Sequence, residues 1–240
     1  MEYYFTSNKN IKDDKLSIEG DDFRHLSKVL RKKSGDLVWV TDGERNLYKT
    51  EIEFIYKDSI KCRIAEKLYN VNEPEIKVTL YQSLIKNPAR FEFVIEKSVE
   101  LGVYEINPLI TEHVISRKSD KTERWQSIAL SAMKQSQRCC LPFVKHPVNF
   151  AKAVSLPGKD DLKIIADERV FSGTIYADEL KSIIRKNRNI SVFIGPEGGF
   201  TTEEIETAIN AGFITVNLGV RKYRSETAAI ALLSIILVNC

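Results

Sequence analysis

From residue 76 to residue 238, short apolar runs alternate with segments that have helical periodicity. The runs are rich in valine and isoleucine, which is typical of strands buried on both faces of a parallel sheet. They are residues 76–84, 106–110, 162–166, 190–194 and 213–218. The helical segments are residues 90–101, 122–140, 176–186, 202–210 and 226–238. This alternation predicts βα units and therefore an α/β fold with a mostly parallel sheet.

The first 70 residues have a different pattern. Strand-like runs at residues 37–41, 47–56 and 59–68 are separated by turn residues, which indicates a small β-rich domain. The polar segment 70–74 follows and contains the first proline of the chain. We therefore predict a domain boundary there, between residues 1–70 and residues 74–240.

One helical segment, residues 22–33, interrupts the β-rich domain and has a basic side. Arg24, Lys28 and Arg31 fall at i, i+4 and i+7, and Lys32 and Lys33 follow. Taken alone, this charge pattern favours a solvated helix face over a binding surface. The whole chain has 36 Lys and Arg against 33 Asp and Glu, a net charge of +3, so overall charge does not make it a polyanion binder.

Several classes of protein are excluded by simple features. The longest uncharged apolar stretch, residues 228–238, is much shorter than the roughly 20 residues of a membrane span. The first residues lack the basic and apolar regions of a signal peptide, so we expect a cytoplasmic protein. The four cysteines form no CxxC motif and the three histidines are scattered, so neither a disulfide framework nor a metal site is predicted.

The segment 191–204 joins a buried strand, a glycine loop and a helix. Gly195, Gly198 and Gly199 lie in the loop, and Thr201 with Glu204 forms a capping box for the helix. Glycines allow a ligand to approach the backbone closely, and the free amides at the helix start offer it hydrogen-bond donors. The spacing is neither a dinucleotide motif nor a Walker loop. A tight structural turn would need the same glycines, so this loop alone does not decide between the two interpretations.

Two further strands end in polar loops. Residues 162–166 lead into Asp167-Glu168-Arg169, and residues 213–218 lead into a loop that ends at Ser225, which is placed to cap the last helix. The carboxyl ends of parallel strands share one edge of a sheet. We therefore expect the three loops to converge on one ligand crevice.

Five short motifs occur in a characteristic order over essentially the whole chain. They are Glu100-Leu-Gly-Val103, Gln135-Ser-Gln-Arg138, Gly195-Pro-Glu-Gly-Gly199, Leu218-Gly219 with Arg221, and Arg224-Ser-Glu-Thr-Ala228. In combination they resemble the small-subunit (16S) ribosomal RNA uridine-N3 methyltransferase family of the SPOUT superfamily. Two departures stand out: Lys222-Tyr223 occupies the place of a branched aliphatic pair, and Ser225 that of the commoner threonine.

The resemblance implies an N-terminal PUA-like β-barrel that binds RNA and a C-terminal α/β domain with a trefoil knot. It also implies a homodimer that uses S-adenosylmethionine, without a metal, to methylate N3 of a uridine in the decoding region of 16S ribosomal RNA, within the small ribosomal subunit. Two alternatives stay open. One is another SPOUT enzyme, acting on a ribose 2′-hydroxyl or on transfer RNA, and the other is a non-catalytic, ribosome-associated RNA-binding protein.

The resemblance also implies roles for individual residues. The methyl donor is expected to contact Ala166, Glu168, Gly195, Pro196, Glu197, Gly198, Gly199, Leu218, Gly219, Tyr223 and Arg224. RNA is expected to contact Arg24, His25, Lys28, Arg31, Lys32 and Lys33, which reverses the interpretation from charge pattern alone.

The expected catalytic residues are Arg138, Glu197 and Arg224. Uridine N3 must lose a proton, and guanidinium groups stabilise the charge left on N3 and on the flanking carbonyl oxygens. Glu197 either handles the proton or holds the amino group of the donor, although it could instead stabilise the following helix N-terminus. Arg138 ends a predicted helix, where it reaches into a cleft or remains solvated.

Overall fold

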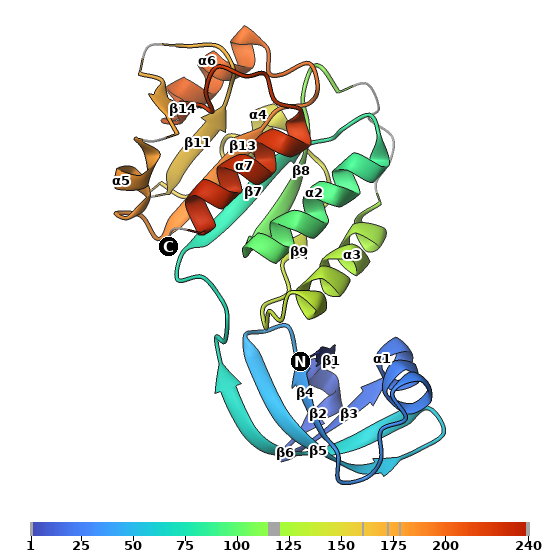
Figure 1. Cartoon of the computed structure of the whole chain (residues 1–240). Coiled ribbons are helices and arrows are strands. Elements are labelled where there is room, and N and C mark those ends of the chain that lie inside the picture. The colour runs from blue at the N-terminus through green and yellow to red at the C-terminus, as the bar shows by residue number, and fades with distance from the viewer. Residues whose placement is uncertain (1, 115–120, 160, 172, 178, 239–240) are drawn as a thin grey trace. The chain divides into compact units, whose positions relative to one another are not determined.

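The computed structural model describes residues 2–114, 121–159, 161–171, 173–177 and 179–238 (Figure 1). The chain divides into two compact units. Unit 1 comprises Met1–Glu73 together with Leu130–Leu141, and unit 2 comprises Pro74–Ala129 and Pro142–Cys240. Helix α3 (Thr122–Gln135) contributes to both.

Unit 1 is built on a sheet with the strand order β1-β4-β5-β6-β3-β2, in which β1 is parallel to β4 and the other neighbours are antiparallel. The elements are β1 (Tyr3–Phe5), η1 (Asn8–Asn10), β2 (Ile11–Lys12), β3 (Lys15–Glu19), β4 (Leu37–Thr41), β5 (Asn46–Ile55) and β6 (Ser59–Tyr69). The three predicted strands are confirmed as β4, β5 and β6. Alternate side chains of these strands, including Val40 and Ile60, are buried in one core with Leu16 and Leu26.

The helical segment of unit 1 is shorter than the sequence predicts. It consists of α1 (Gly20–Arg24) and a π-helical turn, η2 (His25–Val29). The backbone amide of Lys32 donates to the carbonyl of Leu26 at 2.9 Å, and Arg31 has a left-handed φ of 52°. These features end the helix, as left-handed residues commonly do at helix C-termini. The prediction of a helix to residue 33 is therefore wrong, and Arg31 does not continue the helical face of Arg24 and Lys28.

Unit 2 contains the predicted parallel sheet, with the order β10-β8-β7-β13-β11-β14-β12 and with β9 paired to β8. The strands are β7 (Lys77–Ser83), β8 (Glu105–Ile110), β9 (Phe143–Val144), β10 (Val148–Asn149), β11 (Leu162–Ala166), β12 (Ile175–Tyr176), β13 (Asn189–Ile194) and β14 (Ile214–Asn217). All neighbouring strands run parallel. The five predicted strands are confirmed as β7, β8, β11, β13 and β14.

Helices cover both faces of this sheet (Figure 1). On one face α2 (Pro88–Leu101) packs against α7 (Ser225–Leu237), which also contacts α5 (Leu180–Ile184) and β13. On the other face α4 (Phe150–Ala153) packs against α6 (Thr202–Asn210). The core there is aromatic: the Phe193 ring stacks on Tyr81, with ring centroids 4.2 Å apart, and meets Phe213 edge-on at 4.8 Å.

The ends of the long helices follow local rules, with one exception. Asn87 caps α2 by accepting from the amide of Ala89, and Gly102 ends it in a left-handed conformation. Helix α3 ends at Gln135 rather than at residue 140, because Gln137 adopts a left-handed φ of 57°. None of the helices in the described part of the chain combines the length and hydropathy needed to cross a bilayer.

Candidate functional site

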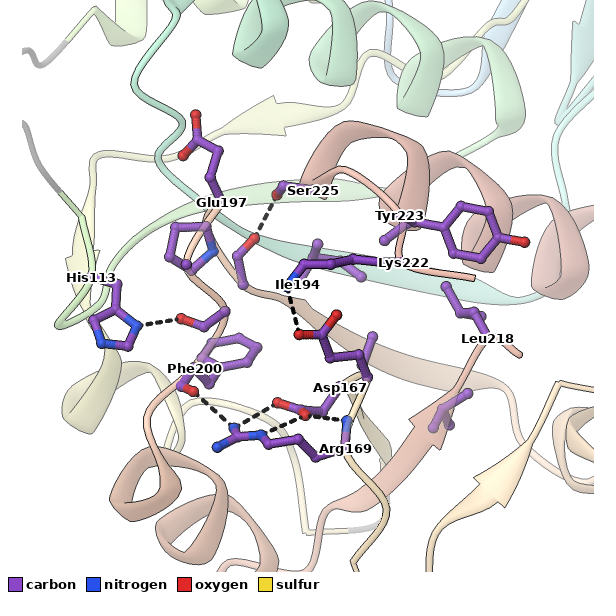
Figure 2. Close-up of a pocket in the computed structure, with 18 of the residues that line it drawn as sticks. His113, Asp167, Arg169, Ile194, Glu197, Phe200, Leu218, Lys222, Tyr223 and Ser225 are labelled. Atoms are coloured by element: carbon purple, nitrogen blue, oxygen red, sulfur yellow. Dashed lines mark hydrogen bonds and ion pairs between the residues drawn. The ribbon is translucent and has the colours of Figure 1, made fainter. Parts of the chain in front are cut away.

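The loops after β11, β13 and β14 line one cavity of about 470 Å³ in unit 2 (Figure 2). The lining residues are His113, residues 166–169, residues 194–203, Val216, Leu218, Gly219, residues 221–223, Ser225 and Ala228. The convergence predicted from three strand ends at one sheet edge is thus present. A concave site of this size accommodates a small organic ligand.

Ten of the eleven residues expected to contact the methyl donor line this cavity. They are Ala166, Glu168, Gly195, Pro196, Glu197, Gly198, Gly199, Leu218, Gly219 and Tyr223. Arg224 does not line it; this residue is exposed and precedes α7 as its N-cap. Sequence reasoning placed the loops of Asp167, Arg169, Arg221, Lys222 and Ser225 at this crevice without assigning these residues to the donor, and it missed His113. His113 follows the end of β8 at the same sheet edge, so the strand-end argument could have found it.

Ser225 fixes the loops to each other. Its hydroxyl donates to the carbonyl of Gly195 (Figure 2) and accepts from Nε2 of Gln82 at 2.9 Å. Gln82 is fully buried near the end of β7. The predicted capping role of Ser225 is wrong, because Ser225 is the first helical residue and makes no capping bond. The hydroxyl instead links β7, the glycine loop and α7. The predicted capping box of Thr201 and Glu204 is confirmed.

Arg169 clamps the loop after β11 to the glycine loop (Figure 2). Its guanidinium donates to both carboxylate oxygens of Asp167 at 2.9 Å and to the carbonyl of Phe200 at 2.8 Å. The hydrogen bond to Asp167 raises the pKa of Arg169 above its usual value, so this cation stays charged. The clamp fixes the backbone of the cavity wall before any ligand arrives.

The loop after β14 is held by a second set of contacts. Asn217 donates from Nδ2 to the carbonyl of Glu168 at 2.9 Å and accepts the amide of Gly219 at 2.8 Å. Gly219 has φ +108°, a conformation that favours glycine. Nζ of Lys222 lies 2.7 Å from Oε1 of Glu168. Lys222, one of the three residues at which the chain departs from the family pattern, therefore forms an exposed ion pair between two cavity loops.

The side chain of Glu197 is directed away from Asp167 and Leu218 (Figure 2). Its Oε1 accepts the backbone amide of Lys86 at 3.1 Å, so the carboxylate anchors the loop between β7 and α2. On another side of the glycine loop, Nδ1 of His113 lies 3.0 Å from the carbonyl of Gly199. Both contacts stabilise the conformation of the glycine loop.

Arg138 lies in unit 1 and is not among the residues that line the cavity. Its Nη2 is 2.7 Å from Oε2 of Glu73, and the two side chains are only 4% and 1% exposed. The other oxygen of Glu73 accepts the amides of Cys139 and Cys140 at 2.9 and 2.8 Å. The guanidinium is therefore neither solvated nor open to a cleft in this conformation, and Glu73 is a partner that sequence reasoning missed.

The residues expected to bind RNA lie within unit 1. Arg24, Lys28, Arg31 and Lys33 are exposed, and His25 and Lys32 are half-buried. Arg24 pairs with Asp21, and Nε2 of His25 lies 3.6 Å from a carboxylate oxygen of Glu2. Two of the six are thus partnered by carboxylates. Across the described ranges, no group of three or more His, Cys, Asp and Glu side chains is arranged to hold a metal ion.

Two sequence families match the chain. The RNA methyltransferase domain matches residues 72–237, and the RNA methyltransferase PUA domain matches residues 18–65. The chain is 35% identical over 211 residues to Ribosomal RNA small subunit methyltransferase E of Mesomycoplasma hyopneumoniae, covering 86% of this chain and 87% of that protein. It is 30% identical over 228 residues to the protein of the same name from Bacillus subtilis, covering 92% and 89%.

A solved structure shares the fold. The Ribosomal RNA small subunit methyltransferase E of Neisseria gonorrhoeae, crystallised with S-adenosyl methionine, matches with a TM-score of 0.87 and 29% identity, covering 99% of this chain and 97% of that chain. The chain combines a parallel-sheet domain that has a cavity at its strand ends with a PUA domain. It therefore belongs to the RNA methyltransferases that carry a PUA domain. Within this class, the chain belongs to the Ribosomal RNA small subunit methyltransferase E family. This confirms the family resemblance seen in the motifs.

Proposed function

We propose that the protein uses S-adenosylmethionine to methylate N3 of a uridine in the decoding region of 16S ribosomal RNA. The observation that carries the proposal is the convergence of three strand-end loops on one cavity. It is supported by the family and by the donor-bound structure of the relative from Neisseria gonorrhoeae.

The cavity fits a molecule with an adenosine part and an amino-acid part. Its wall includes backbone from Gly195 to Gly199 and from Leu218 to Gly219, which offers amides and carbonyls to such a ligand. Tyr223 presents an aromatic ring (Figure 2). Glu168 adds a carboxylate, although an exposed ion pair with Lys222 engages it. The donor supplies a methyl group that is already activated, so the protein has to align it and prepare the nucleophile.

Uridine N3 carries a proton and lies on the Watson–Crick edge, so the base must be unpaired or flipped. We assign Arg224 to contact the base or a phosphate, since it is exposed directly beside the cavity residues Tyr223 and Ser225. Glu197 accepts the backbone amide of Lys86 and so holds the glycine loop in place. We assign to its carboxylate either a contact with the amino group of the donor or the handling of the N3 proton. A catalytic role for Arg138 competes with its structural pairing to Glu73.

The wider arrangement in our proposal has three parts. Basic residues of unit 1, including Lys28 and Lys33, bind RNA backbone with a salt-sensitive affinity. A homodimer acts on the RNA within the small ribosomal subunit. The C-terminal segment forms a knot. The path of the chain supports this part of the proposal: β14 pairs with the outer side of β11, and the next helix, α7, returns to pack against α2 and β13.

The test is nucleoside mass analysis. Small ribosomal subunits from cells that lack the protein are incubated with the protein and labelled S-adenosylmethionine. Their RNA is then extracted and digested to nucleosides. We expect the label in 3-methyluridine. Label in a 2′-O-methyl nucleoside, or only in added transfer RNA, would indicate another SPOUT activity. No transfer, together with no heat of S-adenosylmethionine binding in calorimetry, would indicate a non-catalytic RNA-binding protein.

A further inference from the structure

The loop between β7 and α2 is bonded to the glycine loop that forms part of the cavity wall. The amide of Lys86 is held by Glu197, a cavity residue. Four residues later, in the first turn of α2, Nε of Arg90 lies 3.5 Å from Oε1 of Glu226 in the first turn of α7. Glu226 directly follows Ser225, another cavity residue. None of Lys86, Arg90 and Glu226 lines the cavity itself, but they connect to its wall through Glu197 and Ser225, and we call them the α2 rim.

Arg90 presents unused hydrogen-bond donors at this rim. Its side chain is 36% exposed, and its closest approach to Glu226 is the 3.5 Å between Nε and Oε1. Among the described residues, the guanidinium of Arg90 has no hydrogen-bond partner beyond this loose ion pair. The first turn of α2 itself carries no acidic side chain. In contrast, Asp167 engages the guanidinium of Arg169, and Glu73 engages that of Arg138.

Glu226 provides a second, independent sign of a ligand. The residue is 9% exposed, and its Oε2 is buried without a hydrogen-bond partner among the described residues. A buried carboxylate oxygen with no partner is costly and therefore rare. Oε1 of the same carboxylate holds Arg90. This oxygen needs an N–H or O–H donor, and N3–H of an incoming uridine, before its proton is lost to solvent, is such a donor.

The uracil base that accepts the methyl group carries a negative charge that a guanidinium at the α2 rim can stabilise. N3 of uridine lies between two carbonyl oxygens, and all three atoms share the negative charge after the N3 proton is lost. A planar guanidinium stabilises such a spread charge with paired N–H donors. We propose that Arg90 contacts these carbonyl oxygens as a catalytic residue and that Glu226 is the positioning residue that holds its guanidinium. This inference rests on the proposed function and identifies the acceptor side of the same site.

The transfer balances as follows. N3 gives its proton to solvent, its lone pair forms the bond to the methyl carbon, and the carbon–sulfur bond breaks with its electrons remaining on sulfur. Arg90 lowers the energy of the anion that precedes the bond-forming step. Removing one preorganised donor to such an anion typically costs about 100- to 1000-fold in kcat. Because Arg90 is partly exposed, we expect about 10- to 100-fold.

The experiment compares Arg90→Gln, Glu226→Gln and the double variant with wild type. The matched control is Arg124→Gln, which breaks another ion pair of α2, that between Arg124 and Glu92. Turnover on small subunits is measured as a function of pH, and S-adenosylmethionine affinity is measured by calorimetry. We expect Arg90→Gln to lower kcat about 10- to 100-fold with donor affinity within twofold of wild type, and the control to keep wild-type turnover.

Two further readouts separate a catalytic role from a structural one. A less stabilised anion forms only at higher pH, so the rising limb of log kcat against pH should move up by about one unit or more in Arg90→Gln. As a single variant, Glu226→Gln should lower kcat. In the double variant it should cause no further loss beyond that of Arg90→Gln, because Glu226 acts through Arg90. An unshifted limb, turnover within twofold of wild type, or additive losses would overturn the assignment. Wild-type transfer to a different atom would instead overturn the proposed function and this inference together.

Discussion

Replacing Arg138 with alanine decides between two roles for this residue. The change leaves the Glu73 carboxylate, whose side chain is 1% exposed, with the amides of Cys139 and Cys140 but without its cation. Removing one partner of a buried ion pair costs about 3–5 kcal/mol. Since two amide hydrogen bonds to Glu73 survive, we place Arg138→Ala at the lower end, about 3 kcal/mol.

A loss of this size is easy to measure. A loss of 1 kcal/mol in the free energy of unfolding lowers the thermal unfolding midpoint of a domain of 60–100 residues by about 4–8 °C. We therefore expect unit 1 to unfold at a temperature more than about 10 °C lower than in wild type. Differential scanning calorimetry of the full chain measures this. Arg124→Ala is the control, because that pair is exposed on the arginine side and should contribute less than about 1 kcal/mol.

The opposite result would refute the structural argument. If Arg138→Ala melts within about 2 °C of wild type while turnover falls strongly, the pairing with Glu73 contributes little, and the catalytic role implied by the motif is favoured. Glu73→Gln provides a further check. It should destabilise the protein by a similar amount, because it leaves the guanidinium of Arg138 buried without a counter-charge.

Three other predictions follow from the described contacts. In Gly198→Ala the new Cβ would lie 3.2 Å from Cβ of His113, so the loop must shift, and we expect calorimetry to show donor affinity weakened about fivefold, or about 1 kcal/mol; unchanged affinity would contradict this. Ser225→Ala removes the hydroxyl between Gln82 and the glycine loop, and should lower the free energy of unfolding in urea by about 1–3 kcal/mol. Burial raises the pKa of the Cys62 thiol to about 11, so at pH 8 almost no thiolate is present; native protein should resist iodoacetamide that labels it readily after unfolding, and equal rates would show that Cys62 is accessible.

Much of the fold of unit 2 was predictable, because its long strands are continuous apolar runs and α2 and α6 have clear periodicity and caps. The predicted helix at residues 176–186 is wrong in its extent, because residues 175–176 form β12 and only Leu180–Ile184 form α5. The run that predicts β11 coincides with the observed strand, and the boundaries of α6 agree as well. The strand-end argument then placed the three loops at one sheet edge, where the cavity lies. These features depend on local sequence and on one general property of parallel sheets.

The remaining features depend on contacts between distant residues. The partner of Arg138 is Glu73, 65 positions away in the chain, and no local pattern connects them. Ser225 occupies a position that suits a helix cap, but the carbonyl of Gly195 and the amide group of Gln82 compete for its hydroxyl. The helix at residues 22–33 has the periodicity of a longer element and is closed early by a left-handed Arg31.

The most direct test of the account is a crystal structure of the protein with S-adenosylmethionine. We predict that the donor lies in the cavity between the loops that follow β11, β13 and β14, with its methyl group toward the α2 rim. Density for the donor outside this cavity, or the three loops separated so that they share no ligand, would contradict the central claim.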